Sequence, residues 1–281
     1  MTTATMAAPR RRSHLVVEFA LVITMLAVVI PIAWTMLLGF LPNRAIVSSD
    51  WQFPFWFGNY RDVFADGTFA RQLLNSIGIV LGTIALCLVL GALGGYSLAK
   101  LRPPRWITFP ALGIAGLIPL IPPATLVPGL YVLLNDMGLL GTVFGLVLVN
   151  TLFNLPFATL LMSSYFSALP EELREAALVD GASELRTFLS VMVPLVRPGL
   201  AATGIFVGIM AWNEFLMGLT MTSGGATAPV TVGIAGFLQQ YAVTWGQLAA
   251  AGTIAAIPMV VLSIVASRHI VAGLTAGSVK G

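Results

Sequence analysis

Residues 167–198 read SALPEELREAALVDGASELRTFLSVMVPLVRP and form a polar loop in an otherwise apolar chain. Five of the eleven acidic residues lie within this polar loop. Pro170 is a favourable first helical residue and Gly181 a natural left-handed stop, so we predict a short helix between them. Ser183 can cap a second helix, which we expect to end at Pro194. A segment this polar cannot cross a bilayer, so it must lie on one side of a membrane.

Both predicted helices of the polar loop are amphipathic. In the first helix, Leu173, Ala176 and Ala177 share one face at the helical spacing, and small residues allow a partner to approach closely. The second helix is expected to present a larger apolar face, formed by Leu185, Phe188, Leu189 and Met192. The polar loop therefore has the character of a platform that faces water or another protein.

The composition of the chain indicates an integral membrane protein. Its 281 residues are 58% hydrophobic and 9% charged, with a mean hydropathy of +0.94, whereas soluble domains carry about 25% charged residues. The net charge of +3 comes from basic residues at the ends of apolar runs, so they orient the chain and predict no nucleic-acid partner. Cys87 is the one cysteine, and His14 and His269 flank apolar runs, so we predict no metal site.

We predict an all-α polytopic membrane protein, with one transmembrane domain over residues 1–281 and six transmembrane helices surrounded by membrane lipid. The apolar runs that we expect to span the membrane are residues 15–40, 73–99, 106–134, 140–166, 199–222 and 246–267. Five prolines in the third run should kink or break its helix. Broken backbone is tolerated at membrane depth only where protein covers it or a cavity hydrates it, so this run should line a pathway or a hinge.

The basic residues predict the orientation of the chain. Eleven of the fourteen Lys and Arg residues fall on the side that contains the polar loop, and Arg44, Arg61 and Arg71 fall on the other. Positive charge is retained on the cytoplasmic side, so the polar loop and both termini should be cytoplasmic. The first apolar run is longer than a secretory signal core of roughly 7 to 15 residues, so we interpret it as a retained span.

Several polar residues are predicted to lie within the spans. Asn150 and Asn154 lie one helical turn apart, and they either join helices or line a transport pathway. Trp212, Asn213 and Glu214 belong to the stretch AWNEF near the outer end of the fifth span. Glu214 should face protein or water, where it either makes a structural or gating hydrogen bond or carries a proton. We take these five residues as candidates for a pathway or gate.

An aromatic loop at residues 41–72 admits two interpretations. Its aromatic side chains are Trp51, Phe53, Phe55, Trp56, Phe57 and Tyr60. They form either an interfacial aromatic belt, which we favour, or a surface for stacking a sugar or contacting an extracytoplasmic receptor.

The polar loop resembles the EAA loop of binding-protein-dependent ABC importers. Glu175–Ala177, Gly181 and the closing Val191–Pro194 match its pattern of EAA, three residues, Gly, nine residues, and hydrophobic, any, hydrophobic, Pro. FGNY at residues 57–60, WNEF at 212–215 and the tail GLTAGSVKG at 273–281 are also similar to sugar permeases. The chain looks most like the six-span permease of maltose, trehalose and glycerol-phosphate importers.

This resemblance implies a function and a set of partners. The chain would be a permease for a sugar or sugar derivative in the cytoplasmic (inner) membrane of a prokaryote, moving its substrate by alternating access. Its partners would be a dimer of ATP-binding subunits, a second homologous permease, and an extracytoplasmic sugar-binding protein, free or lipid-anchored. The loop at residues 223–244 would contact that sugar-binding protein.

The same resemblance assigns residues to the ATPase contacts. The residues implied to couple the permease to the ATPase are Glu175, Ala176, Ala177, Asp180, Gly181 and Pro194. The tail residues implied to reach the ATPase are Gly273, Leu274, Thr275, Gly277 and Lys280.

The chain should not itself be an enzyme. It contains no phosphate-binding motif of the form GxxxxGK[ST], no HExxH and no GxSxG, so we predict no catalytic residues and no cofactor of its own. ATP and Mg²⁺ would be bound by the partner ATPase subunits. The alternative function is a proton-coupled secondary transporter that uses Glu214; the absence of an evident repeat with paired broken helices stands against it.

Overall fold

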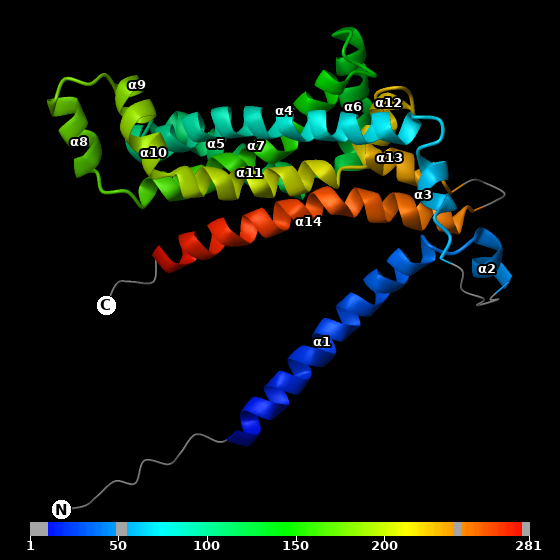
Figure 1. The fold of residues 1–281 in the computed structure, drawn as a ribbon. Coiled ribbons are helices and arrows are strands. Elements are labelled where there is room, and N and C mark those ends of the chain that lie inside the picture. The colour runs from blue at the N-terminus through cyan, green and yellow to red at the C-terminus, as the bar shows by residue number, and fades with distance from the viewer. Residues whose placement is uncertain (1–10, 49–54, 239–242, 277–281) are drawn as a thin grey trace, which may run out of the picture.

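The computed structural model describes residues 11–48, 55–238 and 243–276, and in this part of the chain every regular element is a helix. Four long helices form an elongated bundle (Figure 1): α4 (Thr68–Tyr96), α7 (Val143–Ser167), α11 (Arg197–Trp212) and α14 (Trp245–Ala276). Helix α1 (Arg11–Leu38) diverges from the bundle, and its side chains from Val17 to Thr35 are exposed. The all-α fold predicted from the sequence is confirmed.

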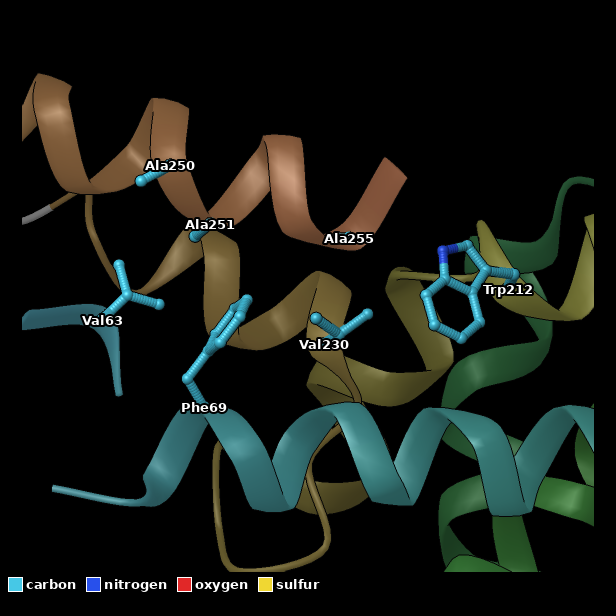
Figure 2. Packing of buried hydrophobic residues seen from close by; sticks show 7 residues of the cluster. All are labelled: Val63, Phe69, Trp212, Val230, Ala250, Ala251 and Ala255. Carbon is cyan, nitrogen blue, oxygen red and sulfur yellow. The ribbon is translucent and has the colours of Figure 1, made fainter. Parts of the chain in front are cut away.

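Short helices close the end of the bundle opposite the polar loop (Figure 1). They are α2 (Asn43–Ser48), α3 (Gly58–Val63), α12 (Leu216–Thr222) and α13 (Val230–Ala235). Figure 2 shows the core beneath them, in which Phe69 of α4 points into the space between α13 and α14. The buried residues of this core are Val63, Phe69, Trp212, Val230, Ala250, Ala251 and Ala255. This core fixes the N-terminal ends of α4 and α14, which lie opposite the polar loop.

Four helices among the described residues are individually long and apolar enough to cross a membrane. They are Val17–Leu38, Thr68–Leu101, Val143–Ser167 and Trp245–Ile264, and each overlaps a predicted span. Two further candidates are bent pairs of helices, Arg105–Leu120 with Pro123–Asp136 and Glu184–Leu195 with Arg197–Trp212. The total of six spans stays a prediction.

The third predicted span, residues 106–134, is not one helix. It divides into α5 (Arg105–Leu117), a 3₁₀ turn (η2, Ile118–Leu120) and α6 (Pro123–Asp136), and the chain bends by 110° between them. The break that the prolines predicted is therefore present. Pro119, Pro122 and Pro123 each lack a backbone N–H, so the α-helical ladder cannot run through this stretch.

The fifth predicted span, residues 199–222, is wrong as a continuous helix. Helix α11 ends at Trp212, and α12 begins at Leu216. The carboxylate of Glu214 accepts hydrogen bonds from the backbone N–H groups of Met217 at 2.7 Å and Gly218 at 2.9 Å. These donors are free N–H groups of the first turn of α12, so the glutamate stabilises the start of a new helix at this point.

Glycine allows α4 and α7 to approach closely. A Cβ atom added to Gly95 would lie 2.6 Å from the backbone nitrogen of Ser163, and one added to Gly91 would lie 3.2 Å from Cβ of Ala158. Gly91 and Gly95 are four residues apart and so lie on one face of α4, a spacing that lets two helix backbones approach closely.

Replacing Gly95 by alanine should lower the melting temperature of the purified protein in lipid nanodiscs. Overpacking against backbone costs about 1 to 3 kcal/mol, which outweighs the gain of up to ~1 kcal/mol in helix propensity. Gly78→Ala is the matched control in the same helix, because its nearest neighbour, Cγ1 of Val143, would lie at an ordinary 3.9 Å. Equal melting temperatures for the two variants would contradict the close contact.

Candidate functional site

The polar loop projects from one end of the bundle as two helical segments joined by a turn (Figure 1). The first segment is α8 (Glu172–Val179), which starts two residues after the predicted Pro170. The second runs without interruption through α9 (Glu184–Thr187), a π-helix (η3, Phe188–Met192) and α10 (Val193–Leu195). The predicted order of helix, glycine turn and helix is confirmed.

The turn between the two segments has the predicted chemistry. Gly181 has a φ of +83°, and the backbone N–H of Ala182 donates to the carbonyl of Ala177 at 3.0 Å. Ser183 caps the second segment, because its hydroxyl oxygen accepts a hydrogen bond from the backbone N–H of Arg186 at 3.4 Å. The left-handed backbone at Gly181 therefore sets the direction in which α8 leaves the second segment.

Pro194 does not end the second segment, so that prediction was wrong. The residues immediately before it form the π-helix η3, and the segment continues through Pro194 to Leu195. The wider π-helical turn changes the backbone pairing just where the proline ring and its missing N–H would disturb an α-helix. The chain bends by 78° one residue later, between Leu195 and Arg197.

The motif residues of α8 face away from the bundle. Glu175, Ala176, Asp180 and Gly181 are exposed, and Ala177 is half-buried. Beside them the side chain of Val179 is 87% exposed. A single exposed apolar residue is ordinary on a protein surface, so this exposure by itself assigns no partner to α8.

Polar and charged side chains attach the polar loop to the end of α4 and to the π-helix that continues it (η1, Ser97–Leu101). We call Tyr96, Lys100, Glu171, Arg174 and Glu184 the loop network. Lys100 Nζ lies 3.1 Å from a carboxylate oxygen of Glu171, and Arg174 contacts both Glu171 at 3.0 Å and Glu184 at 2.8 Å. The Tyr96 hydroxyl donates to Glu184. No pattern in the sequence indicates the contacts of Tyr96 and Lys100, because they depend on where α4 ends in space.

The hydrogen bond from Lys100 lowers the pKa of the Glu171 carboxyl below its usual range. A group whose pKa is lower in the folded protein stabilises that protein above its unfolded pKa, and the contribution is lost as the pH falls through the folded value. The contact between Lys100 and Glu171 therefore favours an attached polar loop at neutral pH.

Three of the five candidate pathway residues lie around one cavity, which we call the amide cavity. It has a volume of about 240 Å³ and is lined by Asn150, Asn154 and Glu214 together with residues of the break between α5 and α6. Trp212 is instead buried in the core formed with Phe69 and Val230 (Figure 2). Asn213 is exposed, and its side-chain amide donates to the carbonyl of Ile209 at 2.8 Å.

The polar groups of the amide cavity are mostly hydrogen-bond acceptors. The NH₂ group of Asn150 donates to the carbonyl of Leu146 at 2.9 Å, and that of Asn154 donates to the carbonyl of Asn150 at 2.8 Å. No described residue donates to the side-chain oxygen of either asparagine. Seven of the ten residues that line the cavity are apolar, so its wall is mostly apolar, with the three polar side chains of Asn150, Asn154 and Glu214 on it.

The end of the bundle opposite the polar loop is aromatic and polar. Phe55, Trp56 and Phe57 are exposed, whereas Trp51 and Phe53 lie outside the described residues. Asn59, in the FGNY stretch, is buried and donates to the backbone carbonyls of Gly39 at 3.0 Å and Leu41 at 2.8 Å. This asparagine therefore satisfies two backbone carbonyls of the turn that follows α1, a role that the sequence analysis had not assigned.

The predicted receptor loop and tail are described in part. In the loop at residues 223–244, residues 239–242 lie outside the described chain, and Asn75 of α4 donates to the carbonyls of Ala226 at 2.9 Å and Ala228 at 3.0 Å. In the tail, Gly273, Leu274 and Thr275 belong to the last turn of α14. Gly277 and Lys280 lie outside the described residues.

Comparisons with known proteins give the family. Residues 88–275 match the family described as binding-protein-dependent transport system inner membrane component. A trehalose transport system permease protein of Mycobacterium tuberculosis is 39% identical over 227 residues, which cover 80% of this chain and 82% of that protein. A diacetylchitobiose uptake system permease protein of Streptomyces coelicolor is 31% identical over 96% of this chain and 90% of its own length.

A solved structure has the same fold. The chain aligns with a crystal structure of a bacterial ABC transporter involved in the import of the acidic polysaccharide alginate, with a TM-score of 0.76. The alignment covers 95% of this chain and 99% of that chain at 21% identity. The arrangement of helices in Figure 1 is therefore that of an ABC importer permease.

The fold and the exposed polar loop define a membrane-embedded transport subunit. The chain belongs to the family of binding-protein-dependent transport system inner membrane components, and it is the permease of an ABC importer. In this family the ATPase and the substrate-binding protein are separate partners, and the permease is not an enzyme and has no cofactor of its own. The alternative of a proton-coupled transporter is thereby set aside, and the hydrogen bonds of Glu214 to α12 match the structural role instead.

Substitutions of Gly181 should impair coupling to the ATPase in a defined order. No atom would lie within 4 Å of a Cβ added there, so backbone strain at positive φ is the only direct effect. Left-handed backbone costs most L-residues roughly 1 to 2 kcal/mol, and asparagine tolerates it better than alanine or valine. We expect uptake to fall in the order Gly, Asn, Ala, Val.

The measurement is ATP-dependent uptake by proteoliposomes that contain the whole importer. Gly116→Ala serves as the control, because it also adds a methyl group into open space but at a helical φ. Full uptake by the valine variant would show that the left-handed turn does not matter for transport.

Proposed function

We propose that this permease moves a sugar or sugar derivative into a prokaryotic cell, with the polar loop and both termini in the cytoplasm. The observation that carries the coupling mechanism is the exposed surface of α8, where Glu175, Ala176 and Asp180 project outside the bundle. The sugar class rests on the relatives, which are named for trehalose, diacetylchitobiose and, in Thermococcus litoralis at 32% identity over 89% of this chain, trehalose and maltose.

The polar loop would dock on one subunit of an ATPase dimer through Glu175–Ala177, Asp180 and Gly181. Pro194 lies within the helical segment that supports this surface. Residues 273–281 would supply a second contact to the same dimer. The ATPase subunits would bind ATP and Mg²⁺, and their closure would draw the polar loops of two permeases together and open the pathway outward. Since coupling is reciprocal, docking of a loaded binding protein outside would favour closure of the ATPase inside.

A second, homologous permease would cover the broken third span. Leu120 is 75% exposed and Ile121 is 39% exposed at the turn between α5 and α6. This turn interrupts the helical hydrogen-bond ladder within an apolar stretch, and lipid cannot satisfy the freed backbone groups. Another protein subunit or a hydrated pathway between two subunits can do so, and both place the amide cavity beside the subunit interface.

The extracytoplasmic binding protein, free or lipid-anchored, would dock at the end of the bundle that carries α3, α12 and α13. A cavity of about 680 Å³ opens there, and its polar lining includes Asp62, Asp66, Gln72 and Ser223. The loop at residues 223–244 borders this cavity. Its position opposite the polar loop suits an arrangement in which sugar is delivered at one end and ATP is used at the other.

Purification of the tagged chain from native membranes should recover an ATPase, a second permease and a sugar-binding protein, identified by mass spectrometry. The reconstituted complex should take up at least one of radiolabelled trehalose, maltose or diacetylchitobiose when ATP is enclosed with the ATPase. A chain that runs alone, or uptake that continues without ATP, would overturn the proposal.

Asn154→Leu should lower sugar uptake while leaving assembly with the ATPase intact. The substitution replaces an acceptor oxygen in the amide cavity by apolar atoms and removes the chance to pair with a sugar hydroxyl, which is worth about 0.5 to 1.5 kcal/mol per hydrogen bond. Thr151→Val on the same helix is the control, because the Thr151 hydroxyl bonds to the backbone carbonyl of Val147 at 2.7 Å and does not line the cavity. Equal uptake by the two variants would remove Asn154 from the pathway.

A further inference from the structure

The loop network joins the end of α4 with η1, the stretch between α7 and α8, and helix α9. One of its members, Lys100, is a buried charged side chain. The side chain of Lys100 is 4% exposed, and an ammonium group taken out of water must be paired. It is paired with Glu171 at 3.1 Å and donates a second hydrogen bond to the carbonyl of Leu169 at 2.7 Å. Both partners belong to the stretch that connects α7 to α8.

Arg174 connects the two helical segments of the polar loop. Its Nε and Nη2 atoms donate to the two carboxylate oxygens of Glu184 at 2.8 and 2.9 Å, and Nη1 donates to Glu171 at 3.0 Å. The guanidinium is a rigid planar fork, and Glu171 is the N-cap residue of α8 itself, so it is the two hydrogen bonds to Glu184 that fix the angle between α8 and α9. A rotation of α8 by itself would break them.

Tyr96 extends the attachment into the membrane helices. Its hydroxyl donates to Glu184, and its ring packs against Phe166 of α7 and Phe188 of η3, with centroids 5.4 and 5.0 Å away. Met162 and Met192 complete this buried cluster. The polar loop therefore contacts α4 and α7 through packed side chains as well as through charge.

Helix α7 leads from this attachment to the amide cavity. Phe166 and Asn154 are separated by twelve residues of uninterrupted helix, or about 18 Å at 1.5 Å per residue. A displacement of the inner end of α7 therefore reaches the cavity wall without crossing a loop. Both helices that meet the loop network, α4 and α7, also pack closely on each other at Gly91 and Gly95.

We propose that the loop network is the device that transmits movement of α8 to the amide cavity, with Tyr96, Lys100 and Arg174 as positioning residues. The inference rests on the proposed coupling of α8 to an ATPase, and it adds the path inside this chain. When the ATPase pulls on α8, the ion pairs and the Tyr96 hydroxyl keep the polar loop rigid, so α4 and α7 move with it.

The test uses the whole importer with two spin labels, one at Glu172 on α8 and one at Leu152 on α7, after Cys87→Ser. Both positions are exposed, so labels fit there. The distance between the labels is measured by electron spin resonance with and without ATP and Mg²⁺. In the otherwise unaltered chain we expect this distance to stay constant while uptake proceeds, because the polar loop and α7 move together.

Three variants weaken the loop network by different amounts. Tyr96→Phe removes one hydroxyl and keeps the ring, Arg174→Gln removes the guanidinium fork, and Lys100→Met removes the buried charge. In each variant we expect ATP to change the distance between the labels and uptake per ATP hydrolysed to fall by about tenfold, within the range usual for coupling between sites. Recovery of the ATPase with the chain should be unchanged for the first two variants, which keeps the test valid if Lys100→Met fails to fold.

Arg186→Ala is the matched control. It removes an arginine from the same loop, and the side chain of Arg186 has no ion pair among the described residues. Arg174→Lys should restore part of the coupling, since it retains the charge but loses the fork. Unchanged distances and unchanged uptake per ATP in Tyr96→Phe and Arg174→Gln would overturn this inference alone. Failure of the unaltered chain to bind an ATPase would overturn the proposed function and this inference with it.

Discussion

A backbone that enters lipid must satisfy its own hydrogen bonds, and this constraint shapes the whole protein. Where α1, α4, α7 and α14 run as helices of 25 residues or more, the interior N–H and C=O groups pair within the helix, except where Pro31, Pro156 and Pro258 lack the N–H donor. The chain departs from this regularity between α5 and α6 and between α11 and α12. Both interruptions contribute residues to the amide cavity, so the same positions that break the helices line this cavity.

The two interruptions are stabilised in different ways. After the end of α11, the two carboxylate oxygens of Glu214 accept hydrogen bonds from the first turn of α12. At the turn between α5 and α6 the prolines remove donors, yet the turn stays exposed in the single chain. At the interruption between α11 and α12, the hydrogen bonds to the freed backbone groups come from this subunit. The freed backbone groups between α5 and α6 need further protein or water as partners. A permease that works as one half of a pair is consistent with this difference.

The polar loop combines a rigid attachment with an exposed face. Two groups of its charged residues differ: Glu171, Arg174 and Glu184 form ion pairs and reach Lys100 and Tyr96, whereas Glu175 and Asp180 have no described partner. The first group supports the position of α8, and the second is free for a partner. The sequence motif includes Glu175 from the second group and no residue of the first. The motif therefore could not reveal the ion pairs that attach the polar loop.

The sequence by itself determined the all-α membrane class, the polar loop with its left-handed Gly181, the broken third span and the family. Each of these follows from local chemistry, since apolar runs, proline, glycine and a spaced motif act within a few residues of themselves. Only the tertiary structure decided that α11 ends at Trp212, that Asn150, Asn154 and Glu214 share one cavity, and that Lys100 pairs with Glu171. Lys100 and Glu171 are 71 positions apart in the sequence, and Asn154 and Glu214 are 60 apart. Whether such distant residues meet depends on how the helices pack, which no local pattern specifies.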